Sequence, residues 1–175
     1  MSEILIIYST TDGHTRVICE YIQDLLTGYD NLVTMVSVEE SNRLDITRYD
    51  KLIIGASIRY GKHSKTVYQF INENLETLNN KPSAFFSVNL VARKPGKNLP
   101  DSNPYFRKFI KQIPWKPDRV AIFAGKLNYP IYSFVDKQII RMIMWITKGP
   151  TDPSTVKEYT DWQQVESFAD SINDM

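Results

Sequence analysis

The chain has 175 residues, 42% of them hydrophobic and 23% charged, which is typical of one globular domain. Its one cysteine, Cys19, excludes an intrachain disulfide framework and a cysteine-based metal site, and no apolar run reaches the roughly 20 residues that span a bilayer. The net charge of +1 conceals an asymmetry: residues 93–148 carry a net +9 and the remainder a net −8. A basic half favours an anionic partner, and a solvated surface is the alternative.

The hydrophobic pattern predicts strands and helices that alternate along the chain. Strands are expected over residues 4–9, 32–38, 52–56, 83–90 and 119–127, and helices over 15–27, 65–78, 103–113, 133–148 and 160–172, with a connector over 45–50. Apolar strands separated by amphipathic helices indicate a parallel sheet covered on both faces. We predict one α/β domain over 1–175, a flavodoxin-like doubly wound sheet of order 2-1-3-4-5, with a helical insert at about 128–158.

The first strand runs into a turn rich in hydroxyl groups, which opens the first helix. Gly13 permits close backbone approach, and Ser9, Thr10, Thr11 and Thr15 supply hydroxyl donors. A helix N-terminus carries unpaired N–H groups and partial positive charge, so it suits a phosphate. An ordinary helix cap is the alternative interpretation.

Ligands of such sheets bind beyond the carboxyl ends of the strands, at the point where the strand order reverses. That rule selects three loops, over residues 9–15, 57–61 and 89–94. The sequence has no G-x-G-x-x-G pattern, which argues against a dinucleotide. A mononucleotide held by hydroxyl and backbone N–H groups is the better match.

The segment from Thr10 to Thr15 resembles the phosphate loop that binds flavin mononucleotide (FMN) in flavodoxins, usually T-x-[ST]-G-x-T. Asp12 stands in place of the usual hydroxyl residue, and we expect it to cap the helix or to pair with Arg16. Residues 55–61, 82–95 and 159–162 resemble one branch, the flavodoxin-type protoporphyrinogen IX dehydrogenases of bacteria, which use quinones as acceptors. The Asp-Gly form of the loop also belongs to that branch. The cofactor contacts that we predict are Ser9, Thr10, Thr11, Asp12, Gly13, His14, Thr15, Ala56, Ser57, Ile58, Arg59, Tyr60, Gly61, Ser87, Val88, Asn89, Leu90, Val91 and Ala92.

The resemblance implies an FMN enzyme of haem synthesis, peripheral on the cytoplasmic face of the inner membrane. It would oxidise protoporphyrinogen IX to protoporphyrin IX and pass the electrons to menaquinone or ubiquinone. The flavin would carry the chemistry, so no catalytic side chain is assigned, and we expect His63 to be an exposed loop residue. A one-electron flavodoxin and a cofactor-free interaction protein remain alternatives.

The insert and the basic segment before it are the candidate contacts for substrate or membrane: Arg93, Lys94, Lys97, Arg141, Met142 and Trp145. The arginines and lysines suit the two propionates of protoporphyrinogen or anionic lipid headgroups. A basic stripe beside Trp and Met suits a membrane interface; a helix packed on the sheet or against a second copy in a homo-oligomer is the alternative. We expect no nucleic acid as partner and no metal.

Overall fold

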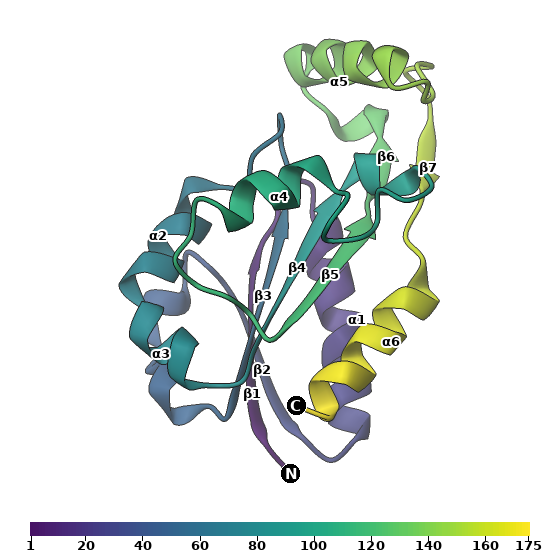
Figure 1. Ribbon diagram of the computed structural model, residues 1–175. Coiled ribbons are helices and arrows are strands. Elements are labelled where there is room, and N and C mark those ends of the chain that lie inside the picture. Colours follow the sequence, from purple (N-terminus) through teal and green to yellow (C-terminus); the bar gives the residue numbers. More distant parts are fainter.

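The computed structural model describes all 175 residues and contains a five-stranded parallel sheet of order β2-β1-β3-β4-β5. The strands are β1 (Glu3–Ser9), β2 (Leu32–Ser37), β3 (Lys51–Ser57), β4 (Ser83–Asn89) and β5 (Arg119–Ala124). Their apolar side chains alternate between two buried faces, which explains the uninterrupted hydrophobic runs. The predicted fold class and strand order are confirmed (Figure 1).

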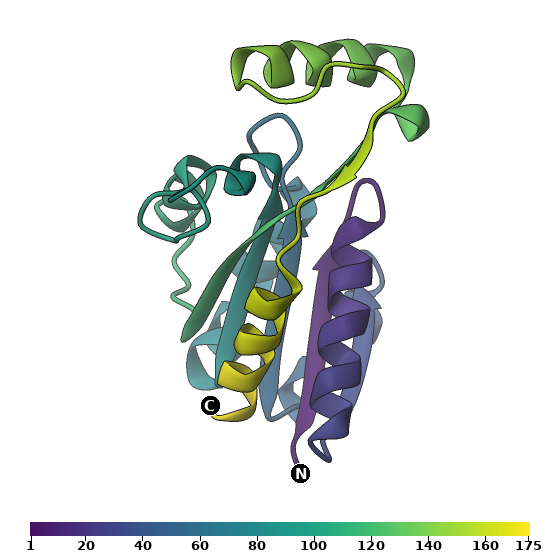
Figure 2. The same ribbon diagram turned by 90° about the vertical axis from the view of Figure 1, so that its right-hand side faces the viewer.

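Helices cover both faces of this sheet and divide the core into two clusters of buried side chains. On one face lie α1 (His14–Gly28) and α6 (Trp162–Asn173), which pack side by side (Figure 2). On the other lie α2 (Lys65–Glu73), α3 (Leu75–Asn80) and α4 (Pro104–Ile110). The larger cluster, of 20 residues, lies under α2 to α4, and the smaller, of 16, under α1 and α6. All the strands therefore end at one edge, with their loops held by a packed body.

Three predicted elements end earlier than expected, each for a local reason. The helix expected over 65–78 is broken at Asn74, whose side-chain amide donates to the Phe70 carbonyl and caps α2. The helix expected to reach residue 113 ends at Ile110, because Pro114 has no N–H to donate to the Ile110 carbonyl and its ring would clash with that carbonyl in a longer helix. The last strand leaves the sheet at Gly125, since β4 has already ended at Asn89. Short 3-10 helices lie at Ser41–Arg43, Ile46–Arg48, Leu90–Arg93 and Tyr129–Ile131.

The segment after β5 forms an antiparallel ribbon that carries a helix. Strand β6 (Lys126–Asn128) pairs with β7 (Val156–Glu158), and α5 (Phe134–Ile146) lies between them in the chain. The predicted insert helix thus exists, but the ribbon at its base was missed. Helix α5 lies across the end of the molecule where the strands finish, and both termini lie at the opposite end (Figures 1 and 2). The structure contains no helix with the length and apolar character that crossing a membrane requires.

Candidate functional site

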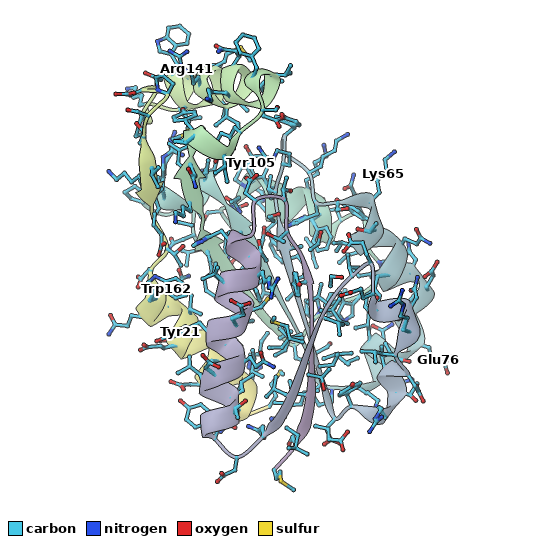
Figure 3. The ribbon with its side chains drawn as sticks, turned by 180° about the vertical axis from the view of Figure 1, so that it is seen from behind. Tyr21, Lys65, Glu76, Tyr105, Arg141 and Trp162 are labelled. Atoms are coloured by element: carbon cyan, nitrogen blue, oxygen red, sulfur yellow. The ribbon has the colours of Figure 1, made fainter.

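A cleft with an enclosed volume of about 120 Å³ lies at the carboxyl edge of the sheet. Its floor is made by the three loops that the switch-point rule selected, and its roof by α5 through Ile140, Ile143, Met144 and Thr147. Tyr105, on the first turn of α4, lies beneath α5 and also lines the cleft (Figure 3). The topology therefore brings together loops that are far apart in the sequence and covers them with the insert.

The first loop has the features of a phosphate cradle. Gly13, at the N-cap of α1, has φ +88° and no side-chain hydrogen bond caps the helix there, so the N–H groups of residues 14–16 have no partner in the protein. Thr10 Oγ1 accepts the Gly13 N–H at 3.0 Å, which closes the turn. The hydroxyl of Thr15 is buried and unpaired. An unpaired buried hydroxyl beside free helix N–H groups fits an oxyanion such as a phosphate.

Asp12 is held away from this cradle by Arg59. The Arg59 guanidinium lies 2.5 Å from the Asp12 carboxylate, and its central carbon lies 5.4 Å from the centre of the Tyr132 ring. Both expected roles of Asp12 are wrong, because the N-cap is Gly13 and Arg16 pairs with Glu20 instead. The ion pair neutralises a charge that would otherwise repel a phosphate, and it joins the first loop to the second.

The second loop is a tight two-residue turn. Arg59 and Lys62 exchange both backbone hydrogen bonds, and the residues between them have positive φ, +50° at Tyr60 and +77° at Gly61. Positive φ at both central positions is the signature of a type I′ turn. Tyr60 is about half exposed at the cleft, and its hydroxyl donates to Asp136 at the start of α5. This turn therefore reaches from the floor of the cleft to its roof.

The third loop is fixed from below by buried polar groups. Asn89 Oδ1 accepts the Ala92 N–H at 3.0 Å and the Asn103 side-chain amide at 3.2 Å. These bonds hold the short helix over Leu90–Arg93 at the end of β4. The neutral side chains of Asn89 and Asn103 therefore help to position the backbone of this loop at the cleft wall.

Neither histidine has the character of an exposed acid or base. His14 Nε2 donates to Thr160 Oγ1 at 2.6 Å, because that hydroxyl in turn donates to the Ala124 carbonyl; burial lowers the His14 pKa. His63 is buried, which corrects the expectation of exposure: it lies against Phe109 with Nε2 2.9 Å from Ser87 Oγ, and burial lowers its pKa to about 3. Both rings are therefore neutral at pH 7.

The predicted contacts fall into those that line the cleft and those that support it. Fifteen line it: Thr10, Thr11, Asp12, His14, Thr15, Ser57, Ile58, Arg59, Tyr60, Gly61, Val88, Asn89, Leu90, Val91 and Arg93. Five others lie behind its wall or beside it: Ser9, Gly13, Ala56, Ser87 and Ala92. Lys94, Lys97, Met142 and Trp145 do not line it, and Arg141 Nε donates to the Thr151 carbonyl. No cluster of three or more His, Cys, Asp or Glu side chains is placed to hold a metal.

Sequence reasoning missed the lining residues beyond the three loops, notably Tyr105, Lys126 and Tyr132. Tyr105 follows an N-cap asparagine, Asn103. That asparagine predicts the start of a helix but does not indicate that the helix lies at the cleft. Lys126 and Tyr132 lie at the base of the insert, and only the turn of the chain at Gly125 brings them to the site. The run of tyrosines around Pro130 was the one available signal.

Comparison with known proteins agrees with this geometry. The sequence model described as a flavodoxin domain matches residues 5–154. The chain is 43% identical over 168 residues to the protoporphyrinogen IX dehydrogenase (quinone) of Escherichia coli, covering 96% of this chain and 93% of that one. The chain belongs to the flavodoxin family, in the branch of these dehydrogenases. The protein of the same name from Leishmania major is 43% identical over 166 residues, covering 94% of this chain and 72% of that one.

Solved flavodoxins share the fold at low sequence identity. A short-chain flavodoxin associated with a bacterial microcompartment superposes with a TM-score of 0.56 at 14% identity, covering 98% of this chain and 97% of that one. A flavodoxin from the domain Archaea superposes with a TM-score of 0.53 at 14% identity, covering 98% and 96%. These likenesses concern the fold alone.

Proposed function

We propose that the chain is an FMN-dependent dehydrogenase that oxidises protoporphyrinogen IX to protoporphyrin IX, a step of haem biosynthesis, and passes the electrons to menaquinone or ubiquinone. One observation carries the proposal. A site suited to one phosphate lies in a cleft that is covered by an apolar helix, α5. Identity of 43% to enzymes of that name supports it. A one-electron flavodoxin would need only the cradle, whereas the roof suits a large apolar substrate.

The side chains of the site bind, orient and exclude water. FMN, when bound, supplies the redox chemistry, accepting hydrogen from the substrate and passing it to the quinone. Thr10, Thr15 and the free N–H groups of α1 would hold its phosphate, and the backbone of the second and third loops would line its ring. With His14 neutral and Asp12 paired with Arg59, the first loop offers no free acid or base to the cleft.

Arg93 remains the proposed contact for a propionate of the substrate. Its guanidinium donates to the Leu90 carbonyl and to the carbonyl and hydroxyl of Thr147, and no carboxylate pairs with it. Lys126 is a second cation at the cleft, and no side-chain hydrogen bond engages it. Neutral acceptors leave the positive charge uncompensated, so a carboxylate at the cleft is attracted to it.

Replacement of Arg93 distinguishes two roles of this residue, which are binding of the substrate and attachment of α5. Arg93→Ala should lower kcat/KM for protoporphyrinogen by about 10–150-fold, the loss of one charged hydrogen bond of about 1.5–3 kcal/mol. Affinity for FMN should change little. Thr147→Val removes only the hydroxyl partner and serves as the matched control, with an expected loss below about threefold. An equal loss in both variants would reduce Arg93 to an anchor of α5.

The decisive experiment is anaerobic turnover of protoporphyrinogen IX with a soluble quinone analogue, with the flavin absorbance followed in parallel. Substrate should bleach the bound flavin and quinone should restore it, over many cycles. A protein that purifies with FMN but is not reduced by the substrate would point to a one-electron carrier. A protein that binds no FMN would point to an interaction protein.

We also propose a location, peripheral on the cytoplasmic face of the inner membrane. The outward side of α5 and of the turn before it carries exposed apolar side chains: Ile131, Phe134, Val135, Met142, Trp145 and Ile146. Basic residues accompany them, among them Arg141 on α5 (Figure 3) and Lys148 just beyond it. An apolar helix face with cations beside it suits an anionic bilayer surface, and anionic lipids would place the enzyme next to its quinone.

Liposome sedimentation tests this location. The protein should bind vesicles containing anionic lipid, and high salt should weaken binding by screening. Met142→Glu with Trp145→Glu should abolish binding, whereas the matched pair Val17→Glu with Tyr29→Glu, on exposed positions of α1 and just after it, should not. Ile143 is not substituted in this test, because it lines the cleft and its loss would also disturb the candidate site. If the wild-type protein binds no vesicles and forms a dimer that Met142→Glu with Trp145→Glu dissociates, this face is a homo-oligomer contact instead.

A further inference from the structure

The roof of the cleft is held to the flavodoxin body at two points. Outside the insert itself, α5 and Thr147 directly after it make hydrogen bonds to the rest of the protein through two residues, Asp136 and Thr147. Asp136 lies in the first turn of the helix, and Thr147 is its C-cap. The two attachments therefore lie at opposite ends of α5, and they differ in kind.

The attachment at the C-terminal end is rigid. Arg93 makes two hydrogen bonds to Thr147, at 2.9 and 3.2 Å, and a third at 2.7 Å to the Leu90 carbonyl, which fixes the guanidinium to its own loop. Gly149 permits this approach, because a Cβ at that position would lie 2.8 Å from Arg93 Nη2 and 2.3 Å from Met144 Cε. Met144 is fully buried against the ribbon base. This end is packed as well as bonded.

The attachment at the N-terminal end is a single exposed contact. The Tyr60 hydroxyl donates to Asp136, and nothing else on the body bonds this half of the helix. Tyr60 is about half exposed and has left-handed backbone, which a non-glycine residue adopts only where the surroundings hold it. Asp136 also accepts from Ser133, which caps α5, so it stays ordered when the Tyr60 contact breaks.

The closed cleft is too small for the reaction that the proposed function requires. Its enclosed volume is about 120 Å³, well below the roughly 300–1,000 Å³ of a site for one drug-sized ligand. Flavin and a tetrapyrrole must occupy it together. The roof therefore has to move, and the end that opens at least cost is the one with a single exposed contact.

We propose that Tyr60 and Asp136 form a latch that determines which substrates reach the flavin. When it opens, α5 swings about the Arg93–Thr147 attachment and the β6–β7 ribbon, and a flat tetrapyrrole enters. Small reductants and oxidants reach the flavin with the latch closed. The identity of the substrate in this inference rests on the proposed function, whereas the motion of α5 does not.

A reversible bridge across the latch tests the selectivity. The native cysteine should not react with the reagent, because Cys19 is fully buried. In the variant Tyr60→Cys with Asp136→Cys, a bis-methanethiosulfonate reagent that spans the latch should lower protoporphyrinogen turnover at least tenfold. Dithionite reduction of the flavin should stay within twofold of its rate in the same variant before bridging, and dithiothreitol should restore the turnover of the unbridged variant. The same reagent on Lys65→Cys with Gln69→Cys, an exposed pair on α2 that includes the labelled Lys65 (Figure 3), should change neither. Full turnover with the bridge in place overturns the latch.

Hydrogen exchange tests the motion without any activity. Tyr60→Phe removes the donor of the contact and Asp136→Asn removes the charge of its acceptor, and each should speed amide exchange over residues 137–141 at least fivefold while residues 144–148 stay unchanged. Asp101→Asn removes an exposed carboxylate elsewhere and is the matched control. Unchanged exchange, or equal acceleration along all of α5, overturns the proposal. Wild-type enzyme that fails to oxidise protoporphyrinogen overturns the proposed function instead, and exchange alone then decides the latch.

Discussion

The flavodoxin body and its roof are stabilised in different ways. In the body, the central strands bury nearly every side chain, and the two core clusters together contain 36 buried residues. In the roof, α5 has thirteen residues and buries two of them, Ile140 and Met144. Burial of apolar area fixes the body, whereas a few polar contacts and a thin apolar seam hold the roof. The body therefore keeps the cofactor in place, and the roof is free to move.

Two glycines give the strongest test of this difference. A Cβ at Gly55 would lie 2.2 Å from Phe86 Cζ, and that ring is packed against Phe123 and Phe168. Gly55→Ala should therefore lower the free energy of unfolding by about 3 kcal/mol, the cost of overpacking a core. At Gly149 the blocking atoms end flexible side chains, so Gly149→Ala should loosen α5 and leave global unfolding nearly unchanged. Denaturant titration and hydrogen exchange measure the two effects. Equal global losses would mean that roof and body unfold as one unit.

The phosphate cradle should separate binding from stability. Thr15→Val removes a buried hydroxyl that has no partner in the protein, so the apo protein should be as stable as before or slightly more stable. Affinity for FMN should fall about 10–150-fold, the equivalent of about 1.5–3 kcal/mol. Flavin fluorescence titration measures the affinity and thermal unfolding measures the stability. Thr27→Val, at the exposed far end of the same helix, should alter neither. A destabilised apo protein with normal affinity would contradict the assignment.

The body should also lose stability in acid through His63. Burial lowers its pKa to about 3, against about 6.5 in the unfolded chain, so the unfolded state binds more protons below pH 6.5. This residue alone should therefore lower the free energy of unfolding by about 2 kcal/mol between pH 7 and pH 5. His63→Phe should remove that part of the slope, which urea titrations at the two pH values would show. The same slope in variant and wild type would indicate that His63 gains a proton in the folded state.

The smallest effect on stability is expected at the outer side of the roof. Trp145 is 75% exposed and Met142 is 56% exposed, so Trp145→Ser with Met142→Ser should change the free energy of unfolding by less than about 0.5 kcal/mol per residue. Chemical denaturation measures this. A loss of several kcal/mol would show that this face is covered in solution, by a second copy of the chain.

Much of the body could be predicted because its signals are local. Apolar runs such as residues 4–7 predict a buried strand, and the hydroxyl-rich turn after them predicts a helix start with a phosphate site. The partner of Asp12 could not be predicted in this way. Arg59 lies 47 residues further along, and only the parallel pairing of β1 and β3 places the two side by side.

The sequence by itself determined the fold class, the strand order, the three loops of the site and the presence of an insert helix, because periodicity and turn residues act over a few positions. Only the tertiary structure decided where that helix lies, which of its sides faces the cleft, and that Tyr60 and Arg93 hold its two ends. Those features arise where chain segments far apart in sequence meet. The apolar pattern of α5 covers most of its surface, so it marks no single inward side, and the bend at Gly125 and the β6–β7 ribbon select one.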